Sequence, residues 1–89
     1  METVLVEQDL LARVGEELKK LELEDFKLFL EGNHVKIVAV SELFNDMSLL
    51  KKQQYIMRAT KPFLSSGEIH AVHIKTFTPE EWKVQKHLY

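Results

Sequence analysis

Four histidines and no cysteine make imidazole the main metal-binding group in this chain of 89 residues. His34 and His70 each stand at the start of a predicted strand, directly after a turn or break. Such positions are held firmly yet stay accessible, and neutral imidazole binds zinc, iron and copper. The two histidines are far apart in the sequence, however, and no short metal-binding motif connects them. Spacing alone therefore leaves a ligand pair and two ordinary surface histidines both open, and it favours the second.

The other two histidines have simpler interpretations. His73 falls within the last predicted strand, where a packed or half-exposed histidine is common, and His87 lies near the C-terminal end. The sequence leaves open whether His73 could replace His34 or His70 as a ligand.

The rest of the chain offers little catalytic chemistry. Without cysteine there is no disulfide framework, thiolate zinc finger, thiol nucleophile or self-contained iron–sulfur site. The serines all stand at predicted turns or helix caps, where backbone hydrogen bonds explain them: Ser41, Ser48, Ser65 and Ser66. The three glycines are isolated, so there is no glycine-rich phosphate loop. The sequence therefore predicts a protein that is not an enzyme.

A modest positive face is predicted on the longest internal helix. It consists of Lys51, Lys52, Arg58 and Lys61. The whole chain has 12 basic and 14 acidic residues, a net charge of −2, whereas dedicated nucleic-acid binders usually have a basic excess. A solvated helix face is the favoured interpretation, and contact with nucleic acid or an acidic partner is the alternative.

Composition predicts one compact domain spanning residues 1–89. The chain is 45% hydrophobic and 29% charged, with three glycines and two prolines, which is the balance of a globular protein. No stretch approaches the ~20 apolar residues of a membrane span. Glu2, Glu7 and Asp9 stand where a secretory signal would be basic. We therefore expect a cytoplasmic protein without membrane contact.

Helical periodicity is clear in two long segments. Apolar residues recur at three- and four-residue spacing over 3–21 and from Ser48 to about Leu64. Pro62 should kink or end the second helix just before itself, because proline cannot donate a backbone hydrogen bond. The predicted buried stripe of this helix consists of Leu49, Leu50, Gln53, Ile56, Met57, Thr60, Phe63 and Leu64. Gly15, inside the first helix, indicates a close packing contact.

Strands are predicted over 26–31, 34–40 and 69–77. The Gly32-Asn33 pair between the first two is typical of a tight hairpin. Alternation along the last strand would place Ile69 and His73 on one face and His70 on the other.

Two short elements complete the pattern. Ser41–Phe44 predicts a helical turn, and Thr78, Pro79 and Glu81 predict a helix start with a capping box. The order is thus helix, strand, strand, short helix, helix, strand and helix. This order indicates an α/β domain with a three-stranded sheet.

Three segments together resemble the BolA-like family. They are Val38–Ser48 (VAVSELFNDMS), Lys51–Gln54 (KKQQ) and Ile69–Trp82 (IHAVHIKTFTPEEW). An IHA strand followed by TPxEW at this spacing is specific, and the short bacterial YrbA (IbaG) branch is the most similar. The resemblance covers about Asp25–Lys86, and the N-terminal helix by pattern and length only.

The resemblance implies an αββααβα fold similar to the class II KH domain. It also implies a monothiol glutaredoxin partner and a bridged 2Fe–2S cluster shared with it, the partner supplying a cysteine and glutathione a second sulfur. The family's invariant histidine matches His70, and its second, variable ligand, from the loop between the first two strands, matches His34. Such a protein would act in iron–sulfur cluster assembly or trafficking, or in iron and stress regulation. We expect no cofactor on the isolated chain.

Nucleic-acid binding is the alternative function that the resemblance implies. BolA itself resembles a transcription regulator, and in KH domains a GxxG loop clamps the nucleic-acid backbone. The matching loop here, Phe44–Ser48, has no glycine and contains an acidic residue. Any such binding would depend on the basic helix face. The sequence also leaves open whether the isolated chain is a monomer or a homodimer.

Overall fold

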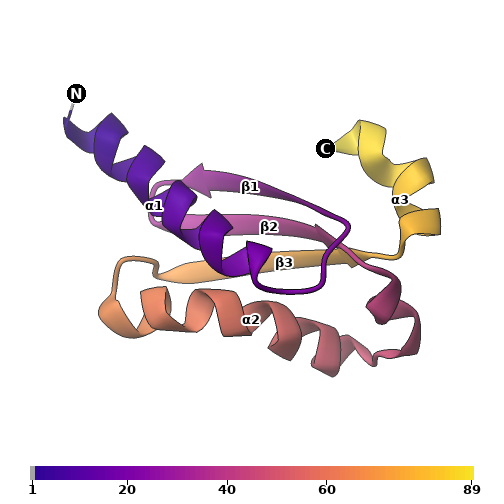
Figure 1. Ribbon diagram of the computed structural model, residues 1–89. Coiled ribbons are helices and arrows are strands. Elements are labelled where there is room, and N and C mark those ends of the chain that lie inside the picture. Colours follow the sequence, from indigo (N-terminus) through magenta and orange to yellow (C-terminus); the bar gives the residue numbers. More distant parts are fainter. Residues whose placement is uncertain (1) are drawn as a thin grey trace.

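The order of helices and strands confirms the predicted αββααβα arrangement (Figure 1). The computed structural model describes residues 2–89, with side chains from Asp9 onward. Its elements are α1 (Glu2–Lys19), β1 (Asp25–Glu31), β2 (His34–Val40), the 3₁₀ helix η1 (Glu42–Asp46), α2 (Leu49–Ser66), β3 (Ala71–Phe77), α3 (Pro79–Gln85) and the 3₁₀ helix η2 (Lys86–Leu88).

The three strands form one sheet in the order β1-β2-β3. β1 and β2 are antiparallel and joined by the predicted hairpin, in which Gly32 has a φ of 63° that favours glycine. β3 runs parallel to β2, with His34 and Ala71 as Cα partners, and η1 and α2 form the crossover between them. Because β2 and β3 are parallel, both strands begin at the same edge of the sheet.

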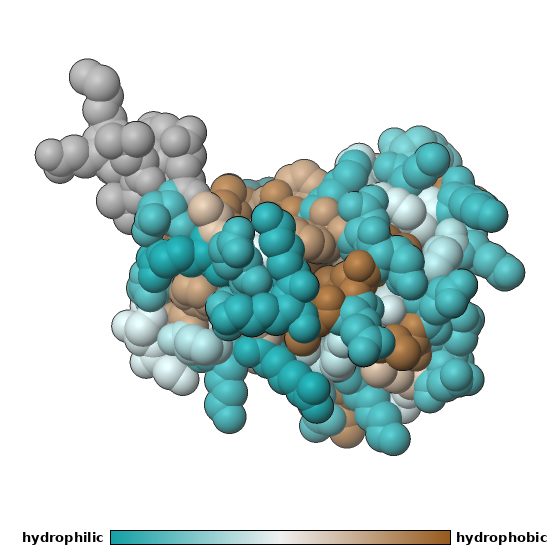
Figure 2. Space-filling model, in the orientation of Figure 1, coloured by the Kyte–Doolittle hydropathy of each residue, from teal (hydrophilic) through white to brown (hydrophobic). Residues whose placement is uncertain are grey.

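One face of the sheet is covered by helices. α1 crosses in front of β1 and β2 in Figure 1, and α2 packs beside it against β3. The buried core between helices and sheet consists of Leu10, Val14, Leu18, Val35, Ile37, Ala39, Phe44, Ile56, Ala59, Phe63 and Ile69. Hydrophilic residues predominate on the outside in the same orientation, with hydrophobic residues visible between them in small groups (Figure 2). The two long helices, α1 and α2, are therefore amphipathic, as their periodicity predicted.

The opposite face of the sheet is covered at one end only. Val38 is fully buried there, under the C-terminal residues. The Cα partner of Val38 is Lys27 on β1, whose Nζ donates to the Tyr89 carbonyl oxygen at 3.0 Å. The rings of Phe77, Trp82 and Tyr89 lie 5.6 to 6.0 Å apart. At the other end of this face, the side chains that β2 and β3 present are exposed: His34, Lys36, His73 and Lys75.

Two expectations about α2 are wrong. First, the helix does not end at Pro62: as the periodicity to about Leu64 predicted, it continues through this residue to Ser66, and it ends at Gly67, which has a φ of 83°. Pro62 has no N–H to donate to the backbone carbonyl of Arg58, four residues earlier. Both residues are exposed, so this carbonyl faces water. Phe63, buried on the inner side, keeps the helix packed against the core. Second, Leu49 and Leu50 are not part of the buried stripe, because they are 72% and 66% exposed. They belong to the first turn of α2, beyond the end of the core.

Ile69 also lies on a different side from the one predicted. It is buried in the core with Phe63, and its backbone N–H donates to the Phe63 carbonyl at 3.2 Å. The alternation fails because β3 begins at Ala71, so residues 69 and 70 precede the regular strand. His73, inside the strand, is exposed and lies on the open face, two positions along from Ala71.

Gly15 provides a stability prediction. It is buried in α1, but a Cβ there would lie 3.7 Å from Leu28 Cδ1, an ordinary van der Waals contact. The close approach expected from the sequence does not therefore require glycine. Gly15→Ala should raise the free energy of unfolding by up to about 1 kcal/mol, because alanine costs less entropy in a helix. Urea denaturation would measure the change, and a less stable variant would contradict this reading of the contact.

The capping box of α3 provides a pH prediction. Glu81 accepts a hydrogen bond from the Thr78 backbone N–H at 2.8 Å, and the Thr78 hydroxyl accepts from the Glu81 N–H at 3.2 Å. The first contact holds the pKa of Glu81 below its ordinary value of 4.5. Because the pKa of Glu81 is lower in the folded protein than in the unfolded one, ionised Glu81 stabilises the folded state above pH 4.5. This stabilisation is lost as the pH falls through the folded-state pKa of Glu81. Glu81→Gln should thus lower the melting temperature near pH 7, with the difference from the original protein shrinking below pH 4.5.

Candidate functional site

The β1–β2 turn and the segment between α2 and β3 meet at the edge where β2 and β3 begin. The backbone N–H of His70 donates to the Asn33 carbonyl oxygen at 2.9 Å. His34 follows Asn33 directly and is the Cα partner of Ala71. The fold thus brings His34 and His70 to one sheet edge from distant parts of the sequence, and both side chains are exposed.

Asn33 also contacts the ring of His70. Its side-chain Nδ2 lies 2.7 Å from His70 Nδ1. In this orientation the amide N–H donates to Nδ1, so the ring hydrogen is on Nε2. Turning the amide over would present Oδ1 instead, which accepts from an Nδ1–H and leaves the Nε2 lone pair free. Metal-bound histidines ordinarily make this kind of contact through their other nitrogen.

Asn33 is a residue that the sequence analysis missed as part of the site. Its place after Gly32 was explained by the hairpin turn alone. No non-glycine residue described here has a positive φ, so the Asn33 backbone itself places no demand on the side chain. Its contact with His70 depends on which segment lies beside the turn, and this information comes only from the pairing of β2 with β3.

The ring of His34 lies beside that of His73. Its ring centroid lies 6.0 Å from that of His73, with the ring planes tilted by 32°. The parallel register brings these two rings together on the open face of the sheet. His73 was considered in the sequence only as a replacement ligand, and its proximity to His34 could not be predicted without the register.

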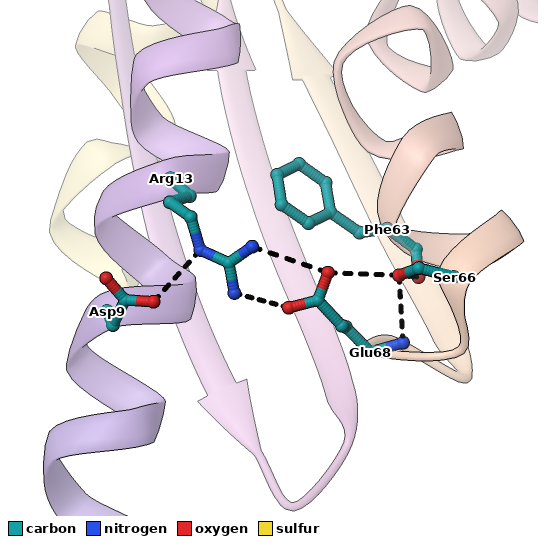
Figure 3. Close-up of polar contacts among 5 residues, drawn as sticks. All are labelled: Asp9, Arg13, Phe63, Ser66 and Glu68. Atoms are coloured by element: carbon teal, nitrogen blue, oxygen red, sulfur yellow. Dashed lines mark hydrogen bonds and ion pairs between the residues drawn. The ribbon is translucent and has the colours of Figure 1, made fainter.

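A polar network fixes the segment that precedes His70 (Figure 3). The Arg13 guanidinium, on α1, donates to both carboxylate oxygens of Glu68 and to Asp9 at 3.0 Å, and it lies over the Phe63 ring, 5.6 Å from its centroid. The Ser66 hydroxyl donates to Glu68 at 3.0 Å. These contacts lower the pKa of Glu68 and raise that of Arg13. His70 is therefore held from two sides, by this network and by Asn33.

The basic residues of α2 do not form one continuous face. Lys51 and Arg58 line a shallow groove with Met47, Gln54 and Tyr55, and the Arg58 guanidinium lies over the Tyr55 ring, 5.5 Å from its centroid. Lys52 instead acts on Glu81 of α3, whose pKa its charge helps to lower. Lys61 is exposed further along the helix.

The donor set limits what the histidines could hold without help. Among the residues whose side chains are described, no group of three or more histidine, aspartate and glutamate side chains is arranged to hold a metal ion. The chain also has no cysteine. A cluster that used His34 or His70 would need sulfur ligands from another molecule.

Comparison with known families decides the identity of the fold. Residues 17–81 match the sequence profile of BolA-like proteins. The chain belongs to the BolA-like family. The acid stress protein IbaG of Escherichia coli K12 is 38% identical over 65 residues, which are 73% of this chain and 77% of IbaG. An uncharacterised protein of Buchnera aphidicola is 39% identical over 69 residues, 78% of this chain and 86% of that protein.

Solved structures agree with this assignment. A BolA-like protein from Babesia bovis superposes with a TM-score of 0.68 at 26% identity, covering 84% of this chain and 91% of that one. BolA1 from Arabidopsis thaliana also gives 0.68, at 27% identity, covering 79% and 92%. The family, its IbaG branch and the fold are thus confirmed. His34, His70 and Asn33 all lie in the matched region of this BolA-like protein.

The helices of this BolA-like protein do not resemble membrane spans in the described residues. Over the part of the chain described, none combines the length and the apolar character that a bilayer crossing needs.

Proposed function

We propose that this BolA-like protein is a non-enzymatic partner of a monothiol glutaredoxin and contributes imidazole ligands to a 2Fe–2S cluster shared with it. The observation that carries the proposal is the exposed edge where His34 begins β2 and His70 directly precedes β3, the parallel neighbour of β2. His70 is the principal ligand. Its Nδ1 lies 2.7 Å from the Asn33 side-chain amide, and with that amide turned to present Oδ1 the ring hydrogen is on Nδ1 and the Nε2 lone pair is free for iron. His34 is the secondary ligand.

The ligand balance explains why a partner is needed. A 2Fe–2S cluster takes four protein-side ligands, usually thiolates, and two histidines replace two cysteines in Rieske centres. This chain has imidazoles and no thiolate. The glutaredoxin cysteine and glutathione would therefore supply the sulfur ligands. Because imidazole is neutral where thiolate is charged, the mixed cluster should have a higher reduction potential than one with four thiolates.

The physiological role of such a complex would be cluster assembly, cluster trafficking, or iron and stress regulation in the cytoplasm. IbaG of E. coli, at 38% identity, is named an acid stress protein, which supports a role in stress. The isolated chain would carry no cofactor, since the cluster exists only in the complex.

Reconstitution tests the proposal directly. A monothiol glutaredoxin would be mixed with iron, sulfide and glutathione under anaerobic conditions, with and without this chain, and followed by visible absorption and circular dichroism. We expect a new spectrum that saturates at one chain per glutaredoxin. The His87→Ala variant, which changes an exposed histidine at the C-terminal end, should give the same spectrum. A spectrum identical with and without the chain would refute the proposal.

Nucleic-acid binding remains the second candidate function. The groove that Lys51 and Arg58 share with Tyr55 is the observation that favours it, because it combines two cations with an aromatic ring. Lys52 and Lys61 lie outside this groove. We expect any DNA affinity to fall steeply with salt and to be lost in a Lys51→Glu, Arg58→Glu variant. No binding at low salt, or binding that charge reversal leaves unchanged, would exclude this function.

A further inference from the structure

The rings of His34 and His73 form an imidazole pair that is separate from His70. His34 is the first residue of β2 and His73 the third of β3. His34 is the Cα partner of Ala71, so His73 lies two positions along on the same side of the sheet. Their ring centroids are 6.0 Å apart, and both side chains are exposed. Exposed side chains can reorient within nanoseconds, so small movements of both rings are available.

The separation of the rings suits a shared metal ion. A histidine nitrogen binds zinc at about 2.0–2.1 Å, so two imidazoles on one tetrahedral ion would hold their ring centroids about 5.2 Å apart. The observed 6.0 Å exceeds this by less than an ångström. Rotation of the two exposed side chains is available to close this difference.

The surroundings provide space and one acidic group. A hollow of about 50 Å³ is lined by Glu31, His34, Lys36 and His73, which is room for an ion and a bound water. Glu31 is the Cα partner of His34, so its carboxylate is on the same face as the two rings. Lys36 also lines the hollow, so its charge opposes a cation there and lowers the affinity, although its side chain is exposed and free to turn toward water. Lys75 lies on the same face but does not line the hollow.

We infer that His34 and His73 form a two-imidazole chelate for a late first-row divalent metal ion, namely Cu²⁺, Ni²⁺ or Zn²⁺. Imidazole suits these ions, and the order of affinity should follow the Irving–Williams series, with Cu²⁺ strongest. Water would complete the coordination, and the nearby Glu31 carboxylate would contribute negative charge without being a ligand. The site needs no partner protein, which separates it from the shared cluster.

One consequence rests on the proposed function. His34 belongs both to this chelate and, as secondary ligand, to the shared cluster. A divalent ion on the pair would therefore withdraw His34 from the cluster and make the cluster less stable. His73 is not a ligand of the proposed cluster. Replacing His73 therefore removes the chelate and leaves His34 available to the cluster.

Metal binding by the untagged, isolated chain tests the chelate. Calorimetric titration with Cu²⁺ should show one ion per chain, and the Cu²⁺ electron paramagnetic resonance spectrum should show two nitrogen ligands. His34→Ala and His73→Ala should each weaken binding by at least ~10-fold and leave one nitrogen. His70→Ala and His87→Ala are matched controls and should change neither result. Since all four side chains are exposed, these variants should fold, which circular dichroism would verify.

Two results would overturn the chelate: Cu²⁺ binding that His73→Ala leaves unchanged, or binding that His70→Ala weakens as much as His73→Ala does.

The consequence for the cluster needs a second measurement. Zn²⁺ added to the loaded complex should speed cluster loss with the original chain but not with His73→Ala, and equal rates would overturn it. If no shared cluster forms at all, the proposed function fails while the titration of the isolated chain still tests the chelate.

Discussion

Replacing His70 by alanine should destabilise the shared cluster by at least ~100-fold and return the visible circular dichroism to that of glutaredoxin alone. Loss of a residue that only supports a metal ligand costs about 10–100-fold in metal affinity, so loss of the principal ligand should cost no less. His70 is exposed and precedes the regular part of β3, so its side chain adds little to the fold. The measurement is the rate of cluster loss to a chelator, followed by absorption.

The variant to compare with His70→Ala is His34→Ala. As the secondary ligand, His34 should matter less than His70, and its loss should leave a cluster with an altered spectrum. The urea midpoints of both variants should stay close to that of the original protein. If His70→Ala gives the original spectrum and the original rate of cluster loss, the assignment of His70 is wrong.

Replacing Asn33 by alanine should weaken the cluster by about 10–100-fold without removing any ligand. The Asn33 side-chain amide lies 2.7 Å from His70 Nδ1. When it presents Oδ1, it accepts from the Nδ1–H and so keeps the hydrogen off Nε2, the nitrogen that binds iron. Without this contact both tautomers and several ring orientations become available, and only part of the population presents an unprotonated Nε2. Long-range ¹H–¹⁵N spectra of the isolated chain should show the Nδ1–H tautomer of His70 in the original protein and a mixture of tautomers in Asn33→Ala.

Asn33→Asp distinguishes positioning from a general loss of structure. A carboxylate can only accept a hydrogen bond, so it should favour the Nδ1–H tautomer and keep Nε2 free for iron. We therefore expect Asn33→Asp to retain most of the cluster stability that Asn33→Ala loses. The backbone of Asn33 has no positive φ, so neither variant should strain the turn. Equal cluster stability in Asn33→Ala and the original protein would remove Asn33 from the site.

Local features of the fold were predictable because neighbouring residues determine them. The hairpin at Gly32 and the capping box of Thr78 and Glu81 follow from turn and cap chemistry, and both are confirmed. The sequence left open whether the second long helix ends at Pro62, and it placed Ile69 on the wrong face. In those places packing against the core overrides the local preference, and the sequence alone does not indicate how strong that packing is.

The candidate site was predictable in part. The resemblance carried by the IHA and TPEEW segments led to His70 and His34, and the family is confirmed, while their roles as ligands stay predictions. The contacts of Asn33 with His70 and of His34 with His73 were outside the reach of sequence patterns. Both depend on the parallel register of β2 and β3, which the α2 crossover determines.

The central claim is that imidazole from this chain binds iron in the shared cluster. Pulsed electron paramagnetic resonance of the reduced cluster tests it most directly, with ¹⁵N-histidine in this chain and natural-abundance nitrogen in the glutaredoxin and glutathione. We predict strong coupling of the cluster to ¹⁵N, which His70→Ala removes or greatly reduces and His87→Ala leaves unchanged. A reduced cluster without ¹⁵N coupling would contradict the account.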